Sequence, residues 1–205
     1  MRITSIVIYC LVAVSLAAHA ENVFIKPYHS FKASFVQKTT QVGTPSAQQK
    51  VLRGKVYFKA PHYFKWIIGK LPDRKQYLMN QQHQLYAVDS SLEQVIIYDL
   101  SQQPSMTLPF ILLQGNSQKI SRFFKVKLLS HSQHNMKYQL TPVQADSPAK
   151  RILLSLSAGR IKMIKVYDKQ GNMVDISFHH ATYNKTISNQ IFKYHTPKHY
   201  DVIHT

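Results

Sequence analysis

The sequence is poor in cysteine, in glycine and in acidic residues. Its single cysteine is Cys10, so no disulfide can form within one chain, and the fold must rely on packing alone. None of its 6 glycines builds a phosphate-cradling loop, which argues against a nucleotide-binding protein. Acidic residues number 9 against 26 lysines and arginines, and no two of them have a spacing that indicates a catalytic carboxylate pair.

The amino terminus has the pattern of an export signal. Met1 and Arg2 precede the apolar run 3–18, and the triplet Ala18-His19-Ala20 predicts cleavage after Ala20. The run is shorter than the roughly 20 residues that a membrane-spanning helix needs. We therefore expect a signal peptide over 1–20, a single domain over 21–205, and a monomer in the periplasm.

The remaining chain is strongly basic. Loss of Arg2 takes the formal net charge from +17 to +16, which predicts attraction to anionic surfaces. Lysines such as Lys55, Lys59 and Lys165 alternate with apolar residues, as on the solvated face of a strand. Because the charges are scattered along the chain, we expect no nucleic-acid partner.

Alternation of apolar and polar residues dominates the chain after residue 50. Short runs rich in β-branched and aromatic residues are separated by turn residues about every ten positions, which predicts an antiparallel meander. The predicted strands are 55–59, 63–67, 76–79, 84–88, 94–98, 123–129, 136–140, 152–156, 161–167, 173–178 and 191–194. The fold class is therefore mainly β, with a single curved antiparallel sheet.

One segment, Pro104–Gly115, breaks the alternation. Prolines open it, an apolar block follows, and Gly115 ends it, which predicts a short helix that starts near Ser105 or Pro109. The helix is apolar nearly all round, so it must be buried, and the concave face of the sheet is the place to bury it.

Five segments stand out by their order and spacing: Ser34–Gln37, Gly54–Trp66, Leu108–Leu113, Leu140–Pro142 and Phe192–Ile203. Together they resemble the LolA family of periplasmic carriers of outer-membrane lipoproteins. The resemblance implies an incomplete β-barrel with a helical lid, whose apolar cavity shields the acyl chains of a lipoprotein. It also implies transient contact with an inner-membrane lipoprotein-releasing ABC transporter complex and with a LolB-like outer-membrane receptor. No cofactor is implied.

Two positions depart from the family pattern. The family commonly has an arginine before the proline of a strand turn, where it helps to hold the lid shut, and this chain has Ala60 there. The family also opens with a longer amphipathic helix, for which Glu21–Ser30, with Pro27, leaves little room.

The candidate residues for the cavity and its lid are apolar. Phe110, Ile111, Leu112 and Leu113 are expected to form the lid, with Phe64, Trp66, Leu78, Ile176 and Phe178 as cavity walls. Phe64 and Lys65 are expected at a rim that meets partners. The alternative for each apolar position is an ordinary core residue. A hollow interior beneath a movable lid is the feature on which the carrier hypothesis depends.

Catalytic and metal sites are not expected. The chain has no Gly-x-Ser-x-Gly motif, and the adjacent His179 and His180 would point to opposite faces of a strand. We therefore expect no enzyme. Two other functions stay open: a carrier of another amphiphile, such as a glycolipid or an anionic lipid, and a structural or signalling module that does not transport.

Overall fold

A computed structural model describes residues 25–26, 28–43, 49–79, 84–100 and 108–205, with only the backbone at 108–110. The predicted signal peptide, with Cys10, lies outside the described residues. Within them, no helix has both the length and the apolar character needed to cross a membrane.

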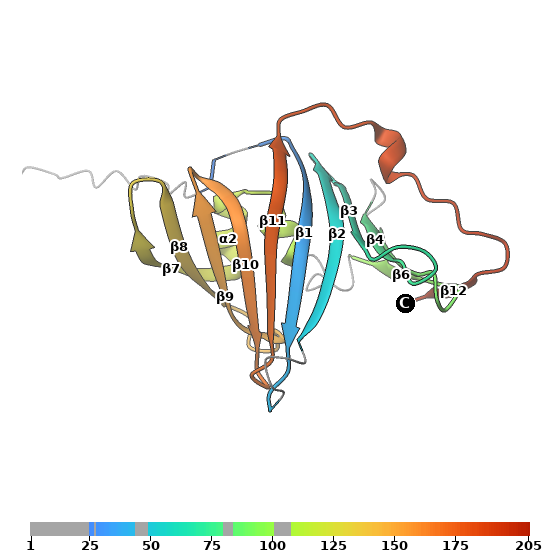
Figure 1. Cartoon of the computed structure of the whole chain (residues 1–205), viewed down its shortest axis with the longest axis horizontal. Helices are drawn as coiled ribbons and strands as arrows, with labels where there is room; N and C mark the ends of the chain where they lie inside the picture. The colour runs from blue at the N-terminus through green and yellow to red at the C-terminus, as the bar shows by residue number, and fades with distance from the viewer. Residues whose placement is uncertain (1–24, 27, 44–48, 80–83, 101–107) are drawn as a thin grey trace, which may run out of the picture.

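One twelve-stranded sheet forms the body of the protein. The strand order is β12-β6-β5-β4-β3-β2-β1-β11-β10-β9-β8-β7, so among the described residues β12 and β7 are free edges and the curved sheet does not close (Figure 1). The bounds are β1 Ser30–Thr40, β2 Lys50–Lys59, β3 Tyr63–Ile68, β4 Lys75–Met79, β5 Gln84–Asp89, β6 Gln94–Asp99, β7 Phe124–His131, β8 Asn135–Pro142, β9 Ala149–Ser157, β10 Arg160–Asp168, β11 Met173–Tyr183 and β12 Asp201–His204. The predicted fold class is confirmed, except that β12 pairs with β6 in parallel.

The strands are joined mainly by short turns of the predicted kind. Gly171 has φ +93° in the β10–β11 turn, a conformation that glycine adopts without steric cost. Asp168 completes this turn, since its Oδ1 accepts a hydrogen bond of 2.8 Å from the backbone N–H of Asn172.

Two short helices cross the concave side of the sheet, where the sequence predicts one. Helix α1 spans Leu108–Leu113 and α2 spans Ser117–Phe123. Gly115, with φ +64°, ends the first as predicted. Asn116 then caps the second, because its Oδ1 accepts a hydrogen bond of 2.9 Å from the N–H of Lys119.

The carboxy-terminal segment after β11 crosses the outer face of the sheet (Figure 1). It contains the 3₁₀ helix η3, Asn189–Phe192, so the strand predicted over 191–194 is wrong. Side chains of the sheet hold the part of the segment around η3: Lys59 Nζ donates to Asn189 Oδ1 (2.6 Å) and Lys65 Nζ donates to the carbonyl of Ile191 (2.9 Å). Its end, β12, is held by pairing with β6.

Candidate apolar binding site

The concave face of the sheet is a continuous apolar surface. Inward positions of neighbouring strands meet in register; Phe35 lies opposite Phe178, and Val56 lies opposite Trp66. The buried side chains on this surface include Phe31, Phe35, Val56, Phe58, Phe64, Trp66, Leu140, Ile152, Leu154, Leu156, Ile164 and Phe178. A surface of this extent suits an apolar ligand and offers few groups to a polar one.

Aromatic rings form the centre of this surface. The rings of Phe35 and Trp66 lie 4.3 Å apart between centroids, and Trp66 meets Phe178 edge to face at 6.2 Å. Gly54 makes the packing possible, because a Cβ there would lie 2.4 Å from Cζ of Phe35. The sequence predicts Phe64 and Trp66 on one face, and both belong to the same cluster.

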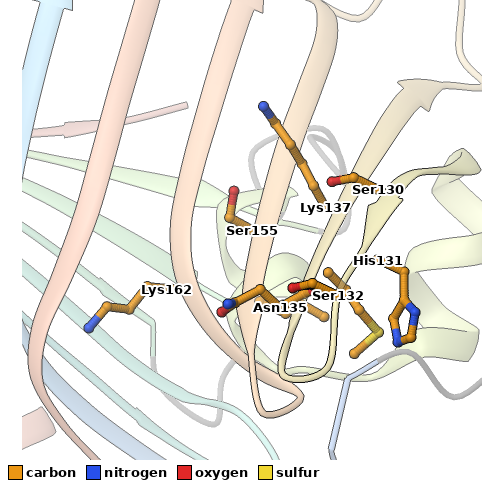
Figure 2. Close-up of a pocket in the computed structure, with 9 residues that line it drawn as sticks. Ser130, His131, Ser132, Asn135, Lys137, Ser155 and Lys162 are labelled. Atoms are coloured by element: carbon orange, nitrogen blue, oxygen red, sulfur yellow. Dashed lines mark hydrogen bonds between the residues drawn. The ribbon is translucent and has the colours of Figure 1, made fainter.

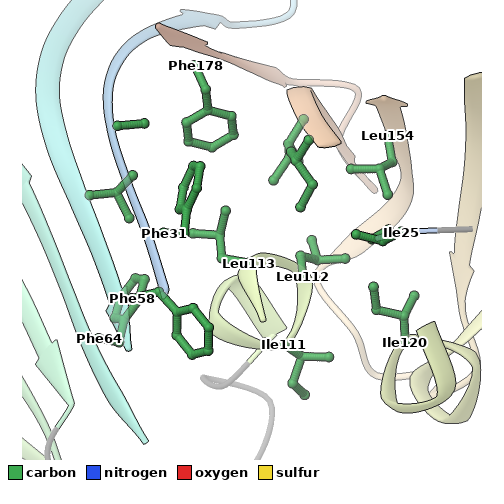
Figure 3. Close-up of a cluster of buried hydrophobic side chains, with 14 of the residues drawn as sticks. Ile25, Phe31, Phe58, Phe64, Ile111, Leu112, Leu113, Ile120, Leu154 and Phe178 are labelled. Atoms are coloured by element: carbon green, nitrogen blue, oxygen red, sulfur yellow. The ribbon is translucent and has the colours of Figure 1, made fainter. Parts of the chain in front are cut away.

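Helix α1 fills the space above the aromatic rings. Ile111, Leu112 and Leu113 are all buried, with Leu113 only 1% exposed. Figure 3 shows these side chains between Phe31, Phe58 and Phe64 on one side and Ile25 and Ile120 on the other. Among the described residues, the side chains of α1 therefore occupy the interior, where the sequence predicts an open hollow.

A buried tyrosine holds the end of α1. The hydroxyl of Tyr28 donates a hydrogen bond to the carbonyl of Leu113, the last residue of the helix. Burial raises the pKa of this hydroxyl well above its usual value, so it stays protonated and remains a donor. The absence of a side chain at Gly115 leaves space for the ring of Tyr28, because a Cβ at this position would lie 2.5 Å from Cε1 of Tyr28.

The residues around Tyr28 tie the amino-terminal segment to both the helices and the sheet. The N–H of Ile25 donates to Ser117 Oγ (3.2 Å), at the start of α2, and the N–H of Lys26 donates to the carbonyl of Gly159 (2.9 Å). The guanidinium of Arg160 lies 5.8 Å from the ring centroid of Tyr28 and 4.6 Å from that of Tyr183. Ile25, Lys26 and Tyr28 belong to the stretch 21–30 of the sequence, for which the family resemblance implies a longer helix.

Comparison with known proteins agrees with this geometry. The sequence profile described as "Outer membrane lipoprotein carrier protein LolA" matches residues 27–195. The chain belongs to the LolA family. It is 31% identical to an outer-membrane lipoprotein carrier protein of Hahella chejuensis, over 94% of this chain and 93% of that protein. The carrier of the same name from Pseudomonas putida is 28% identical, over 85% and 80%.

Among solved structures, the fold resembles that of an uncharacterized conserved protein from Thermus thermophilus. The TM-score is 0.51 at 12% identity, with 87% of this chain and 91% of that chain covered. This likeness shows the fold. The family profile and the named relatives support a carrier role for the chain as a member of the LolA family.

The structure brings most of the predicted LolA-type wall residues together. Phe64, Trp66 and Phe178 belong to the inner cluster, and Ile176 is half-buried against it. Leu78 does not join them. It pairs with Lys65, which puts it on the outer face, where it packs with Val88 and Val95 in a second cluster beneath Tyr194 and Tyr200.

The two residues predicted at a partner-binding rim lie on opposite faces of β3. Phe64 is only 5% exposed, within the inner cluster. Lys65 lies on the outer face, where η3 covers it, and burial lowers the pKa of its ammonium group. The side chain of Phe110 lies outside the described residues. At Ala60, the position of the family arginine, the exposed side chain makes no latch, and the backbone N–H donates to the carbonyl of His29 (2.8 Å).

Sequence reasoning missed Tyr28, whose hydroxyl donates a hydrogen bond to the end of α1. Its partner, Leu113, is 85 positions away in the chain, so no local pattern connects the two. The signal that could have found it is indirect. A buried tyrosine needs a hydrogen-bond acceptor, and the last turn of a buried helix has carbonyls without intrahelical partners.

Proposed function

We propose that this protein shields the acyl chains of outer-membrane lipoproteins while they cross the periplasm. The observation that carries the proposal is the apolar surface under α1, which combines Phe31, Phe35 and Trp66 on the sheet with three buried side chains on a single short helix. Outward movement of α1 would expose this surface to the chains. No chemistry on the cargo is needed for this role.

The energies favour exchange of the lid for an acyl chain. Exposing Ile111, Leu112 and Leu113 costs about 1.5 to 3 kcal/mol each, or about 5 to 9 kcal/mol together. Burying a chain of about sixteen carbons gains roughly 12 kcal/mol, at about 0.8 kcal/mol per methylene. One chain therefore suffices to hold the lid open, and the closed lid prevents the apolar surface from facing water when no cargo is bound.

The same energies limit how tightly a carrier can bind. Three such chains carry about 35 kcal/mol of transfer free energy, whereas non-covalent affinities saturate near about −20 kcal/mol. Extraction from a membrane therefore needs an external energy source, and release needs a receiver that binds better. We infer loading by an inner-membrane lipoprotein-releasing ABC transporter complex and delivery to a LolB-like outer-membrane receptor. The names of the relatives and the predicted export signal support this route.

Tyr28 gives the lid its closed position. A hydrogen bond to the carbonyl of Leu113 in a dry environment is lost when α1 moves outward, so it biases the equilibrium toward the closed state. In this chain it would serve where Ala60 offers no side chain to reach the lid.

Native mass spectrometry of the protein purified from the periplasm without detergent tests the proposal. We expect a one-to-one complex with triacylated lipoprotein, and we expect depletion of the protein to disturb the sorting of outer-membrane lipoproteins. Finding only a glycolipid or an anionic lipid would replace the cargo with another amphiphile. Recovery of an empty protein that also fails to bind a tripalmitoylated peptide in vitro would overturn the carrier function.

A further inference from the structure

The free edge of β7 is a feature that acyl-chain binding leaves unused. β7 ends the strand order and pairs only with β8, so one side of its backbone has no strand partner among the described residues. Every residue from Lys127 to His131 is exposed, and Leu128 and Leu129 are 50% and 43% exposed. An exposed edge with adjacent leucines is a template for an added strand.

β7 also runs from the interior to the surface. Its first residue, Phe124, is 1% exposed and belongs to the inner cluster together with Ile120 of α2. Val126 packs against that cluster, and Leu128, two positions further on, is half-exposed. A polypeptide segment that leaves the apolar interior beside α2 can therefore run along the edge of β7 from its buried start to its exposed end.

The positive charges of β7 determine which kind of strand can pair with its free edge. Lys125 and Lys127 lie opposite Thr141 and Gln139, on the outer face, whereas Val126 and Leu128 alternate with them on the inner face. Neither β7, β8 nor α2 contains an acidic residue. A complementary strand would therefore place acidic side chains on the outer face and apolar ones on the inner face.

The same charges disfavour a second copy of this chain. Pairing of β7 with itself would bring Lys125 and Lys127 of one copy beside those of the other, and like charges on paired strands repel. The lysines therefore block self-association while they attract an acidic segment.

The surface hollow at the exposed end of β7 is also lined without acidic residues. A hollow of about 300 Å³ lies there, lined by residues that include Ser130, Lys137, Ser155 and Lys162 (Figure 2). Its nine lining residues include no carboxylate. An acidic segment that continues past the end of β7 and over β8 to β10 would therefore meet no like charge in this hollow.

We infer that the edge of β7 binds the extended polypeptide segment that follows the acylated terminus of the cargo, as an added strand with acidic residues beside Lys125 and Lys127. This rests on the proposed function, because acyl chains in the interior place the start of that segment near Phe124. The buried position of Phe124 favours the cargo over another partner. Only the cargo has a segment that is attached to acyl chains inside the apolar cluster.

Two tripalmitoylated peptides of equal length test the inference, one with an acidic and alternating apolar tail and one with lysines in place of the acids. We expect the mature protein to bind the acidic peptide about tenfold more tightly. The double variant K125E/K127E should reverse this preference and leave the affinity for palmitate unchanged. The matched control is R53E/K55E on β2, which has the same spacing and charge change but lies on a strand paired on both sides with β1 and β3. It should keep the preference for the acidic tail.

Hydrogen exchange supplies an independent measurement. Amides of residues 124–131 should gain protection with the acidic acylated peptide and not with palmitate. Equal affinity for both tails, an equal effect of the two double variants, or protection that appears only with dimerisation would overturn the inference. If neither palmitate nor either peptide binds, the proposed function fails; if all bind with no dependence on the tail, only the inference about β7 fails.

Discussion

Replacement of Tyr28 by phenylalanine should loosen the lid and increase the affinity for acyl chains. The variant keeps the ring, which packs edge to face on Phe58 at 6.0 Å and on Tyr183 at 5.1 Å, and removes only the hydroxyl. It leaves the carbonyl of Leu113 without this donor in a buried position. The cost of such an unpaired group is about 1 to 3 kcal/mol, and it falls on the closed state.

This cost translates into a binding change. If acyl chains bind only when α1 has moved, the apparent dissociation constant equals the intrinsic constant divided by the open fraction. A loss of about 1.4 kcal/mol from the closed state raises the open fraction about tenfold and lowers the apparent dissociation constant by the same factor. Titration with a fluorescent fatty acid measures this constant directly.

Tyr183→Phe is the matched control. The hydroxyl of Tyr183 also donates to a backbone carbonyl, that of Ile161 at 3.2 Å, but this bond joins β11 to β10 and does not involve α1. Both variants should lose stability toward urea, and only Tyr28→Phe should gain affinity. Unchanged or weaker binding by Tyr28→Phe, or an equal gain in both variants, would refute the reasoning about the lid.

Two further predictions follow from burial. Phe64→Glu places a carboxylate among Phe58 and Trp66 and should lower the free energy of unfolding by several kcal/mol, on the order of 3 or more, in urea denaturation; a loss below about 1 kcal/mol would show that Phe64 is not a core residue. Burial raises the pKa of Tyr183 from 10.0 to about 12, so its stabilising contribution is complete below pH 10 and is lost as the pH rises to 12. The stability of Tyr183→Phe should therefore fall less steeply over that interval than the stability of the unmodified protein, and identical slopes would contradict the assignment.

Strands β2 to β11 were predictable because their alternation is local, whereas β1 and β12 were not among the predicted strands. The alternation within runs such as Lys55–Lys59 and Tyr63–Ile67 predicts which side chains face inward. The structure places those side chains in the inner cluster. Leu78 shows the limit of this reasoning. Its face depends on the pairing of β3 with β4, which sets it opposite Lys65, and apolar character alone could not tell one buried face from the other.

Features that depend on distant partners were not predictable. β12 exists because Asp201–His204 pairs with β6, and η3 is fixed by contacts with Lys59 and Lys65. Helix α2 carries only one fully buried apolar side chain, Ile120, so its sequence shows little amphipathic pattern. In each case tertiary contacts, and not local propensity, decide the structure.

The central claim is that acyl chains enter the interior by displacing α1. The chain has no cysteine after residue 20, so Leu112→Cys in the mature protein gives a single reporter thiol on the buried side of the lid. Its labelling by a soluble thiol reagent should be slow without ligand and about tenfold faster with a tripalmitoylated peptide bound. Leu154→Cys, on the floor of the same cluster, should stay protected in both states. A thiol at position 112 that reacts no faster when the peptide is bound would contradict the claim.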